Sequence, residues 1–215
     1  MRTAIKQPVI PHSFSSYSNA DCTSPSYEGC LFDVSQPLPT PLSSSASFSQ
    51  CTFIKLTSST NGGAISFTSD SPHTVRECFF RECSTVSYVN WQSGGGAVSS
   101  SAGSLSVYSS TFISCDTPGF GGAVLGTSNS VLIDVSQCLV FGCLGGYCGG
   151  GISAHYSSAA DISSCRFLLC ECNEYGGGYY HNNNITLPLK VSNSLFRKNT
   201  AKKNSGNRGG GGLED

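Results

Sequence analysis

Charged residues are scarce in this sequence of 215 residues. They make up 12% of the chain, about half of the usual share. Lysine and arginine number 12, aspartate and glutamate number 13, and the net charge is -1. Because there is no cationic surplus to neutralise phosphates, the composition disfavours a nucleic-acid-binding protein.

Long apolar runs are also missing. No stretch approaches the ~20 apolar residues that a membrane-spanning helix requires, so we expect no membrane-spanning segment. The opening residues, MRTAIKQPVIPHSF, lack the apolar core of a signal peptide. The chain is nevertheless not typical of a disordered tail, because 38% of its residues are hydrophobic and they are regularly placed.

Proline and serine are concentrated in residues 1–47, which hold most of the nine prolines. Proline cannot donate the backbone hydrogen bond that a central strand needs. We therefore interpret residues 1–47 as a leader that is loosely ordered or covers the end of the domain that follows.

Two short motifs alternate strictly through residues 48–213. The first is a glycine pair followed by a small and an apolar residue, as in GGAI from Gly62, and it recurs at Gly95, Gly121, Gly149, Gly176 and Gly210. The second places a cysteine or serine two residues before an aromatic or apolar one, and its copies are CTFIKL, CFFREC, STFISC, CLVFGC, CRFLLC and SLFRKN. Such regular recurrence indicates an internal repeat.

The repeat predicts stacked coils. Apolar and polar residues alternate just before each copy of the second motif, which is typical of strands with one buried face. A solenoid requires the same residue type at the same offset in every unit, because each coil lies about 4.8 Å from the previous one. We therefore predict an all-β fold, a right-handed parallel β-helix of about five to six coils with two or three strands each, truncated at its C-terminal end.

The register of the motifs predicts which side chains form the core. We expect the glycine pairs to turn a tight corner that excludes a Cβ atom. Two interior columns follow from the offsets: Phe53, Phe80, Phe112, Val140, Phe167 and Phe196, and Val75, Val107, Val135, Ile162 and Val191.

The motifs carry a family resemblance. GGAI followed by F-x-x-N resembles the repeat of the chlamydial polymorphic outer membrane proteins, and related repeats occur in adhesin-like and pectin-lyase-like right-handed β-helices. GGAI at Gly62 and FRKN from Phe196 match fully, whereas cysteine replaces the asparagine in FREC, FISC and FLLC. The resemblance covers roughly residues 48–213. It implies the β-helix fold and says little about function.

The 12 cysteines allow three interpretations. Zinc binding is disfavoured because the C-x4-C spacing follows the repeat and there is no CxxC pair, so we expect no metal site and no cofactor. Disulfides would suit a secreted protein. We favour a third interpretation, in which eight cysteines are small apolar core residues in columns. Cys22, Cys30, Cys148 and Cys172 lie off these columns and are the better disulfide candidates.

One pair of carboxylates is the only candidate catalytic site. Asp134 and Asp161 occupy the same outward position in consecutive coils, so we expect them to lie about 5 Å apart. Such a pair could perform acid/base catalysis or bind Ca²⁺, or could simply be two solvated surface groups. The histidines His12, His73, His155 and His181 share no repeat position and are expected in exposed loops.

Two insertions give a candidate binding surface. They leave the solenoid at the same corner and would project on one side, where repeat proteins often bind their partners. The first, 84–93, carries Tyr88 and Trp91, and the second, 201–209, carries Lys202, Lys203 and Arg208. Alternatively, the two insertions are longer loops that the fold tolerates and that have no binding role.

The sequence favours a role in surface display over a role in catalysis. We expect a non-enzymatic, adhesin-like binding or structural segment, extracellular or at the cell surface, with a carbohydrate or a cell-surface protein as partner. A pectin-lyase-like carbohydrate-active enzyme, or a fragment of one, is the alternative. The single glycosylation sequon, at Asn184, agrees with export.

Overall fold

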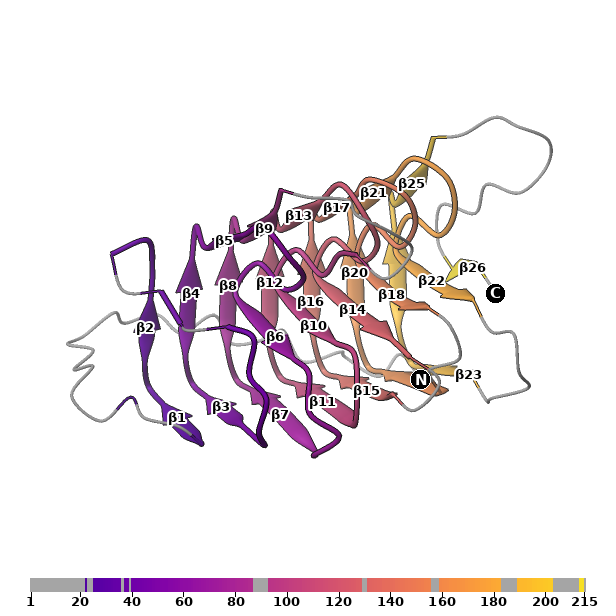
Figure 1. Cartoon of the computed structure of the whole chain (residues 1–215). Coiled ribbons are helices and arrows are strands. Elements are labelled where there is room, and N and C mark those ends of the chain that lie inside the picture. The colour runs from indigo at the N-terminus through magenta and orange to yellow at the C-terminus, as the bar shows by residue number, and fades with distance from the viewer. Residues whose placement is uncertain are drawn as a thin grey trace.

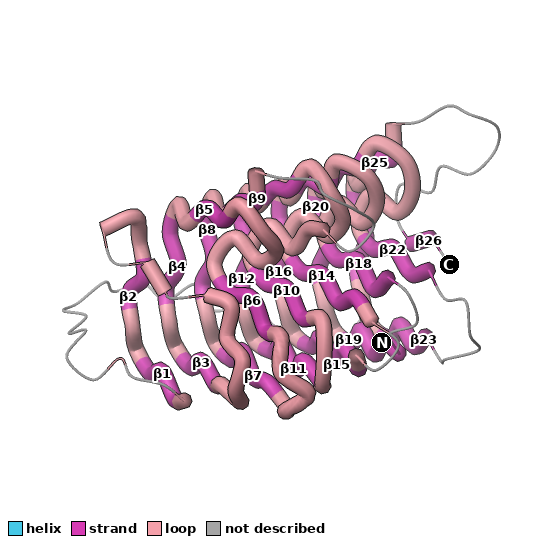
Figure 2. The backbone as a smooth tube through the Cα atoms, in the orientation of Figure 1, coloured by secondary structure: helices cyan, strands magenta, loops and turns pink. Residues whose placement is uncertain are grey.

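The chain forms a parallel β-solenoid of about five turns in a computed structural model (Figure 1). The structure describes residues 22, 25–35, 37–38, 40–86, 93–128, 131–155, 159–182, 189–202 and 213–214. All regular structure in these residues is β-strand, arranged as short straight segments that alternate with corners (Figure 2). The predicted all-β parallel β-helix is confirmed.

Each coil crosses four sheets, which we name A to D in the order in which the chain visits them. Sheet A consists of β1 (Ser26–Glu28), β3 (Ser47–Ser49), β7 (His73–Arg76), β11 (Ser104–Tyr108), β15 (Leu132–Ser136), β19 (Ala159–Ser163) and β23 (Leu189–Ser192). Sheet B consists of β2 (Leu31–Phe32), β4 (Thr52–Ile54), β8 (Phe79–Arg81), β12 (Thr111–Ile113), β16 (Leu139–Phe141), β20 (Arg166–Leu168) and β24 (Leu195–Arg197).

The other two sheets complete the coil. Sheet C consists of two-residue strands: β5 (Thr57–Ser58), β9 (Ser84–Thr85), β13 (Asp116–Thr117), β17 (Leu144–Gly145), β21 (Glu171–Cys172) and β25 (Thr200–Ala201). Sheet D consists of β6 (Ile65–Phe67), β10 (Val98–Ser100), β14 (Val124–Thr127), β18 (Ile152–His155), β22 (Tyr179–Asn182) and β26 (Leu213–Glu214). Four strands per coil correct the predicted two or three, because a two-residue strand is too short to show an alternating pattern.

Both predicted interior columns are confirmed. Phe53, Phe80 and Phe112 are in register on β4, β8 and β12, and their rings stack with centroids 4.5 and 4.7 Å apart. Phe167 and Phe196 stack in the same way at 4.6 Å. The valine column continues from Val75 through Val107 to Val135 in sheet A. The side chains of both columns are fully buried except in the last coil, where Val191 and Phe196 are partly buried. Burial of identical positions therefore holds the coils in register.

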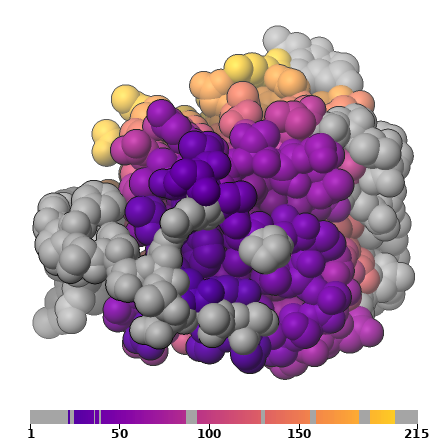
Figure 3. All heavy atoms as spheres, turned by 60° about the vertical axis from the view of Figure 1, so that its left-hand side comes forward, coloured from indigo at the N-terminus to yellow at the C-terminus, as the bar shows by residue number. Residues whose placement is uncertain are grey.

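The solenoid has a coil before the first recognised repeat. Strand β1 pairs with β3 and β2 pairs with β4, and both strands lie in the segment assigned to the leader. Tyr27 stacks on Phe48 and Phe32 stacks on Phe53, so this coil extends the interior columns. Figure 3 turns this end of the molecule toward the viewer.

The glycine pairs turn the corner between sheets C and D, as predicted. The first glycine has a positive φ in every described copy, for example 65° at Gly62 and 67° at Gly121. The second has no room for a side chain, since a Cβ on Gly122 would overlap the backbone of Gly150 in the next coil. The two glycines therefore meet two different requirements, one conformational and one steric.

Two further corners use left-handed backbone mostly without glycine, the exceptions being Gly29 and Gly142. They join sheets A to B and B to C, and in most coils the residue there has φ between 49° and 56°. The next residue points its side chain inward and is the repeat's cysteine, serine or asparagine, except after Lys55, where it is Leu56. Ser110 Oγ accepts a hydrogen bond from the Cys78 backbone N–H at 3.1 Å, and Asn199 Oδ1 accepts one from Cys170 N–H at 3.0 Å. These side chains thus satisfy backbone donors of the preceding coil.

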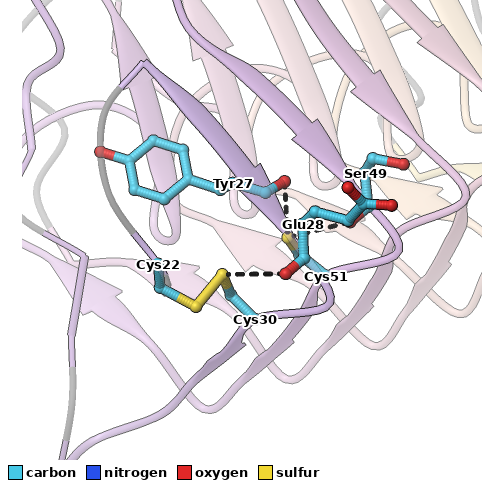
Figure 4. Close-up of a disulfide and its surroundings, with 6 residues drawn as sticks. All are labelled: Cys22, Tyr27, Glu28, Cys30, Ser49 and Cys51. Carbon is cyan, nitrogen blue, oxygen red and sulfur yellow. Dashed lines mark hydrogen bonds between the residues drawn. A yellow bond between two sulfur atoms is a disulfide. The ribbon is translucent and has the colours of Figure 1, made fainter. Parts of the chain in front are cut away.

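The cysteine predictions are confirmed in part. Eight column cysteines are free and buried, and burial raises the pKa of thiols such as Cys115 and Cys138, which keeps them protonated. Cys22 and Cys30 form a disulfide (Figure 4). The prediction that Cys30 lies off the columns is wrong, because the Thr52 N–H that follows Cys51 bonds to the Cys30 carbonyl at 2.7 Å.

Cys148 and Cys172 are not disulfide-bonded, which corrects their assignment as candidates. They lie in consecutive coils but not opposite each other: Cys148 bridges to Tyr175, whereas Cys172 is in register with Gly145. The Cys172 thiol instead donates a hydrogen bond to the Tyr175 carbonyl at 3.0 Å. Both thiols are buried, so they pack the corner that precedes the glycine pairs.

Candidate functional site

The two aspartates lie where their equal offsets placed them. Asp134 on β15 and Asp161 on β19 are register partners on the outer side of sheet A. Their neighbours in the strand, such as Ile133 and Val135, are fully buried, so the carboxylates point outward. Lys190 continues the column on one side and Ser106 on the other.

The electrostatics of this pair are asymmetric. Lys190 Nζ lies 3.2 Å from Asp161 Oδ2, so one carboxylate has a cationic partner. Partial burial, and secondarily the negative charge of Asp161, raises the pKa of Asp134. Asp134, whose pKa is raised, thus lies beside a carboxyl group that is paired with a lysine. Within the described residues, no group of three or more His, Cys, Asp or Glu side chains could hold a metal ion.

The prediction of exposed histidines is wrong for the three that the structure describes. His73, His155 and His181 are 1%, 3% and 4% exposed. They occupy strand positions, and the rings of His73 and His155 lie against Phe67 and Phe120 at centroid distances of 4.1 and 4.4 Å. Burial, and secondarily the charge of His181, lowers the pKa of His155 to about 4, so this imidazole is a neutral packing group at pH 7.

Most of the predicted insertion surface lies outside the described residues. This holds for Tyr88, Trp91, Lys203 and Arg208, and also for the sequon residue Asn184. The described part of each insertion continues sheet C, as β9 and β25. Lys202 is described, and its Nζ pairs with Glu171 Oε2 at 2.6 Å.

The outer side of sheet B forms an apolar surface that the sequence analysis missed. In β16, β20 and β24 the central side chain is interior and the flanking side chains point outward, whereas the first residue of β4 and of β12 is a buried threonine. In β16, β20 and β24 these outward side chains form what we call the basic-apolar face: Leu139, Phe141, Arg166, Leu168, Leu195 and Arg197. Phe141 is 38% exposed and Leu195 is 37% exposed.

A sequence signal for this face exists in retrospect. The strand residues of the motif CLVFGC are all apolar, so β16 lacks the polar outward positions of a half-buried strand. Leu139 and Phe141 flank the interior Val140 and cannot share its burial.

A second outer cluster lies over sheet D. Phe120, Leu125 and Cys148 are buried apart from the core, with Tyr147, Tyr175 and Tyr180 packed against them. Phe120 lies 5.6 Å from Tyr147, centroid to centroid, and Tyr175 lies 6.2 Å from Tyr180. These aromatic contacts tie the corner before each glycine pair to the outer side of the sheet.

Comparison with protein-family models, curated proteins and solved structures returned no match. Among the described residues there is also no helix with the length and apolarity to cross a bilayer. The assignment of function therefore rests on the surfaces of the solenoid itself.

Proposed function

We propose that this chain is a non-enzymatic binding segment, adhesin-like and displayed at the cell surface or secreted, which presents the basic-apolar face to a partner. The observation that supports this proposal is the exposure of that face. Of the seven large hydrophobic side chains that are exposed among the described residues, Phe141, Leu144, Leu169 and Leu195 lie on it or beside it. Clustered exposed apolar side chains are typical of interaction surfaces.

The resemblance of the repeat to polymorphic outer membrane proteins agrees with such a role. Cell-surface proteins and carbohydrates are the partner classes that this role suggests. The rigid stack suits it as well, because consecutive coils hold the outward side chains at a spacing of about 4.8 Å.

A binding measurement tests the proposal. Fluorescently labelled protein is incubated with animal and bacterial cells and bound protein is quantified by flow cytometry. We expect the wild type to bind at least one cell type, Phe141→Ser to lose most of the signal and Leu132→Ser to retain it. Leu132 is a matched control because it is a leucine on sheet A that is 49% exposed. Absence of binding to every cell type would contradict the proposal.

A carbohydrate-active enzyme is the second candidate, favoured by the raised pKa of Asp134 beside Asp161. Glycosidic bond cleavage uses two neighbouring carboxyl groups, one of which has a raised pKa. The same preparations are therefore incubated with uronic-acid polysaccharides. Turnover that disappears in both Asp134→Asn and Asp161→Asn would establish this candidate and exclude the non-enzymatic proposal.

A further inference from the structure

The outer side of sheet B, which includes the basic-apolar face, carries arginines and no carboxylate. The outward positions of β8, β12, β16, β20 and β24 hold three arginines and no carboxylate, since they are Phe79, Arg81, Thr111, Ile113, Leu139, Phe141, Arg166, Leu168, Leu195 and Arg197. Arg81 is paired with Glu82 at 3.3 Å. Glu171, on the adjoining sheet C, is paired with Lys202. The remaining arginines, Arg166 and Arg197, therefore make this end of the face cationic.

The positions of these two arginines relative to the apolar side chains are fixed by register. Arg166 on β20 lies between Leu139 on β16 and Leu195 on β24 in one column. Arg197 ends the other column, which runs through Phe141 and Leu168. Each guanidinium therefore lies next to outward-pointing apolar side chains of the same face.

We propose that the basic-apolar face binds the surface of an anionic phospholipid membrane. The apolar side chains would lie at the boundary between headgroups and acyl chains. The two guanidiniums would pair with phosphate oxygens, for which their planar fork of donors is suited. This inference rests on the proposed function and names the partner of the same face.

The hydrogen-bonding capacity of the face favours a lipid partner over a protein partner. A protein interface of standard size contains about ten direct hydrogen bonds. On β16, β20 and β24 the outward side chains that can form hydrogen bonds are those of Arg166 and Arg197 alone. A lipid surface requires only apolar contact and charge, both of which the face supplies.

Vesicle flotation tests the inference. The probes are vesicles of phosphatidylcholine alone and vesicles of phosphatidylcholine with phosphatidylglycerol. We expect the wild type to float with the anionic vesicles only, and less as salt is added, because salt screens the attraction. Arg166→Gln and Arg197→Gln should each weaken binding by about fivefold, because a basic residue near an anionic membrane surface contributes about 1 kcal/mol.

Matched variants separate a specific face from general stickiness. Phe141→Ser should weaken flotation, whereas Leu132→Ser and Arg76→Gln on sheet A should not. Failure of the wild type to float with anionic vesicles at low salt would overturn the inference, as would equal binding to neutral vesicles or equal loss in the sheet A controls. If cells still bind the protein in that case, and protease treatment of the cells abolishes binding, the proposed function holds with a protein partner.

Discussion

At the scale of single residues, each coil has two positions for the repeat's cysteine, and at each of them a backbone N–H of the preceding coil needs a partner. Serine and asparagine meet this need directly, as Ser194 does for the Cys165 N–H at 3.1 Å. Asn199 also donates from Nδ2 to the Phe167 carbonyl at 3.1 Å. Cysteine fills the same volume with a thiol that donates to the carbonyl two residues earlier, as in Cys170. Asn and Cys can therefore share one position because both fit the space and both bond to the backbone, although through different groups.

Asn199 provides a test of this explanation. Asn199→Ala removes both hydrogen bonds and should lower the free energy of unfolding by about 1 kcal/mol, as for a half-buried hydrogen-bonded group. Asn199→Cys should cost less, because cysteine occupies this position in neighbouring coils. Urea unfolding followed by circular dichroism measures both. Equal losses in the two variants would show that the cysteine column does not substitute for asparagine.

His155 gives the fold a predictable sensitivity to acid. Its pKa is about 4 in the folded chain and about 6.5 in the unfolded one. The folded state therefore disfavours the charged form of His155. Above pH 6.5 this residue does not reduce the free energy of unfolding, and the free energy of unfolding falls as the pH drops from 6.5 toward 4. The loss amounts to something of the order of 3 kcal/mol at full protonation.

The comparison of wild type with His155→Phe isolates this effect, because phenylalanine can keep the contact with Phe120. Between pH 7 and pH 4 the wild type should lose more unfolding free energy than the variant, as measured by urea titration at each pH. Parallel losses in both proteins would mean that His155 is not the group responsible.

At the scale of the coil's elements, the corners differ in whether they tolerate a side chain in place of glycine. Gly122 has no space for a methyl group, since its Cβ would overlap the backbone of Gly150 and Leu144. Gly142 has a φ of 61° but open space, with only Ser114 Oγ at 3.8 Å. Its counterparts in adjacent coils, Ser114 and Leu169, already adopt the same backbone without glycine.

Alanine substitutions should separate the two corners. We expect Gly122→Ala to cost about 3 kcal/mol or more, because backbone must move, and Gly142→Ala to cost about 1 kcal/mol of backbone strain. Thermal unfolding of the two variants beside the wild type gives the order. A Gly142→Ala variant as unstable as Gly122→Ala would refute the steric argument.

Elements with a periodic signal could be predicted from the sequence, and those without one could not. The alternation around Val107 and Val135 located sheet A, and the fixed offsets of Phe80 and Phe112 gave the register of sheet B. Sheet C has two-residue strands and no period. The coil containing β1 and β2 has no glycine-pair motif, and its one signal is the Cys30-Leu31-Phe32 copy of the second motif.

The candidate sites divide in the same way. Asp134 and Asp161 have equal offsets, which sufficed to place them side by side. The basic-apolar face was not predicted. It consists of outward side chains from two neighbouring columns, and a motif describes the residues of only one column at a time. The buried histidines were missed because their aromatic partners, such as Phe120, come from a different part of the coil.

At the scale of the whole molecule, each coil contacts only its neighbours, so damage at one end should stay there. The Cys22–Cys30 disulfide closes a loop with a sequence separation of eight in the first coil. Its loss in Cys22→Ser should cost about 2 to 3 kcal/mol locally. Hydrogen exchange should show lost protection in β1 to β4 and unchanged protection in β15 to β20. Uniform loss along the chain would contradict this one-dimensional stability.

Because successive coils pair in the same register, the length of the solenoid can change without a change in how its coils pack. Ser104 and Leu132 are register partners at the start of β11 and β15, and every corner between them recurs in the next unit. A duplication or excision of one such unit would lengthen or shorten the rod by about 4.8 Å and leave the flanking faces in phase. Gain or loss of whole units can therefore change the length of the rod one coil at a time, while the contacts between coils stay the same.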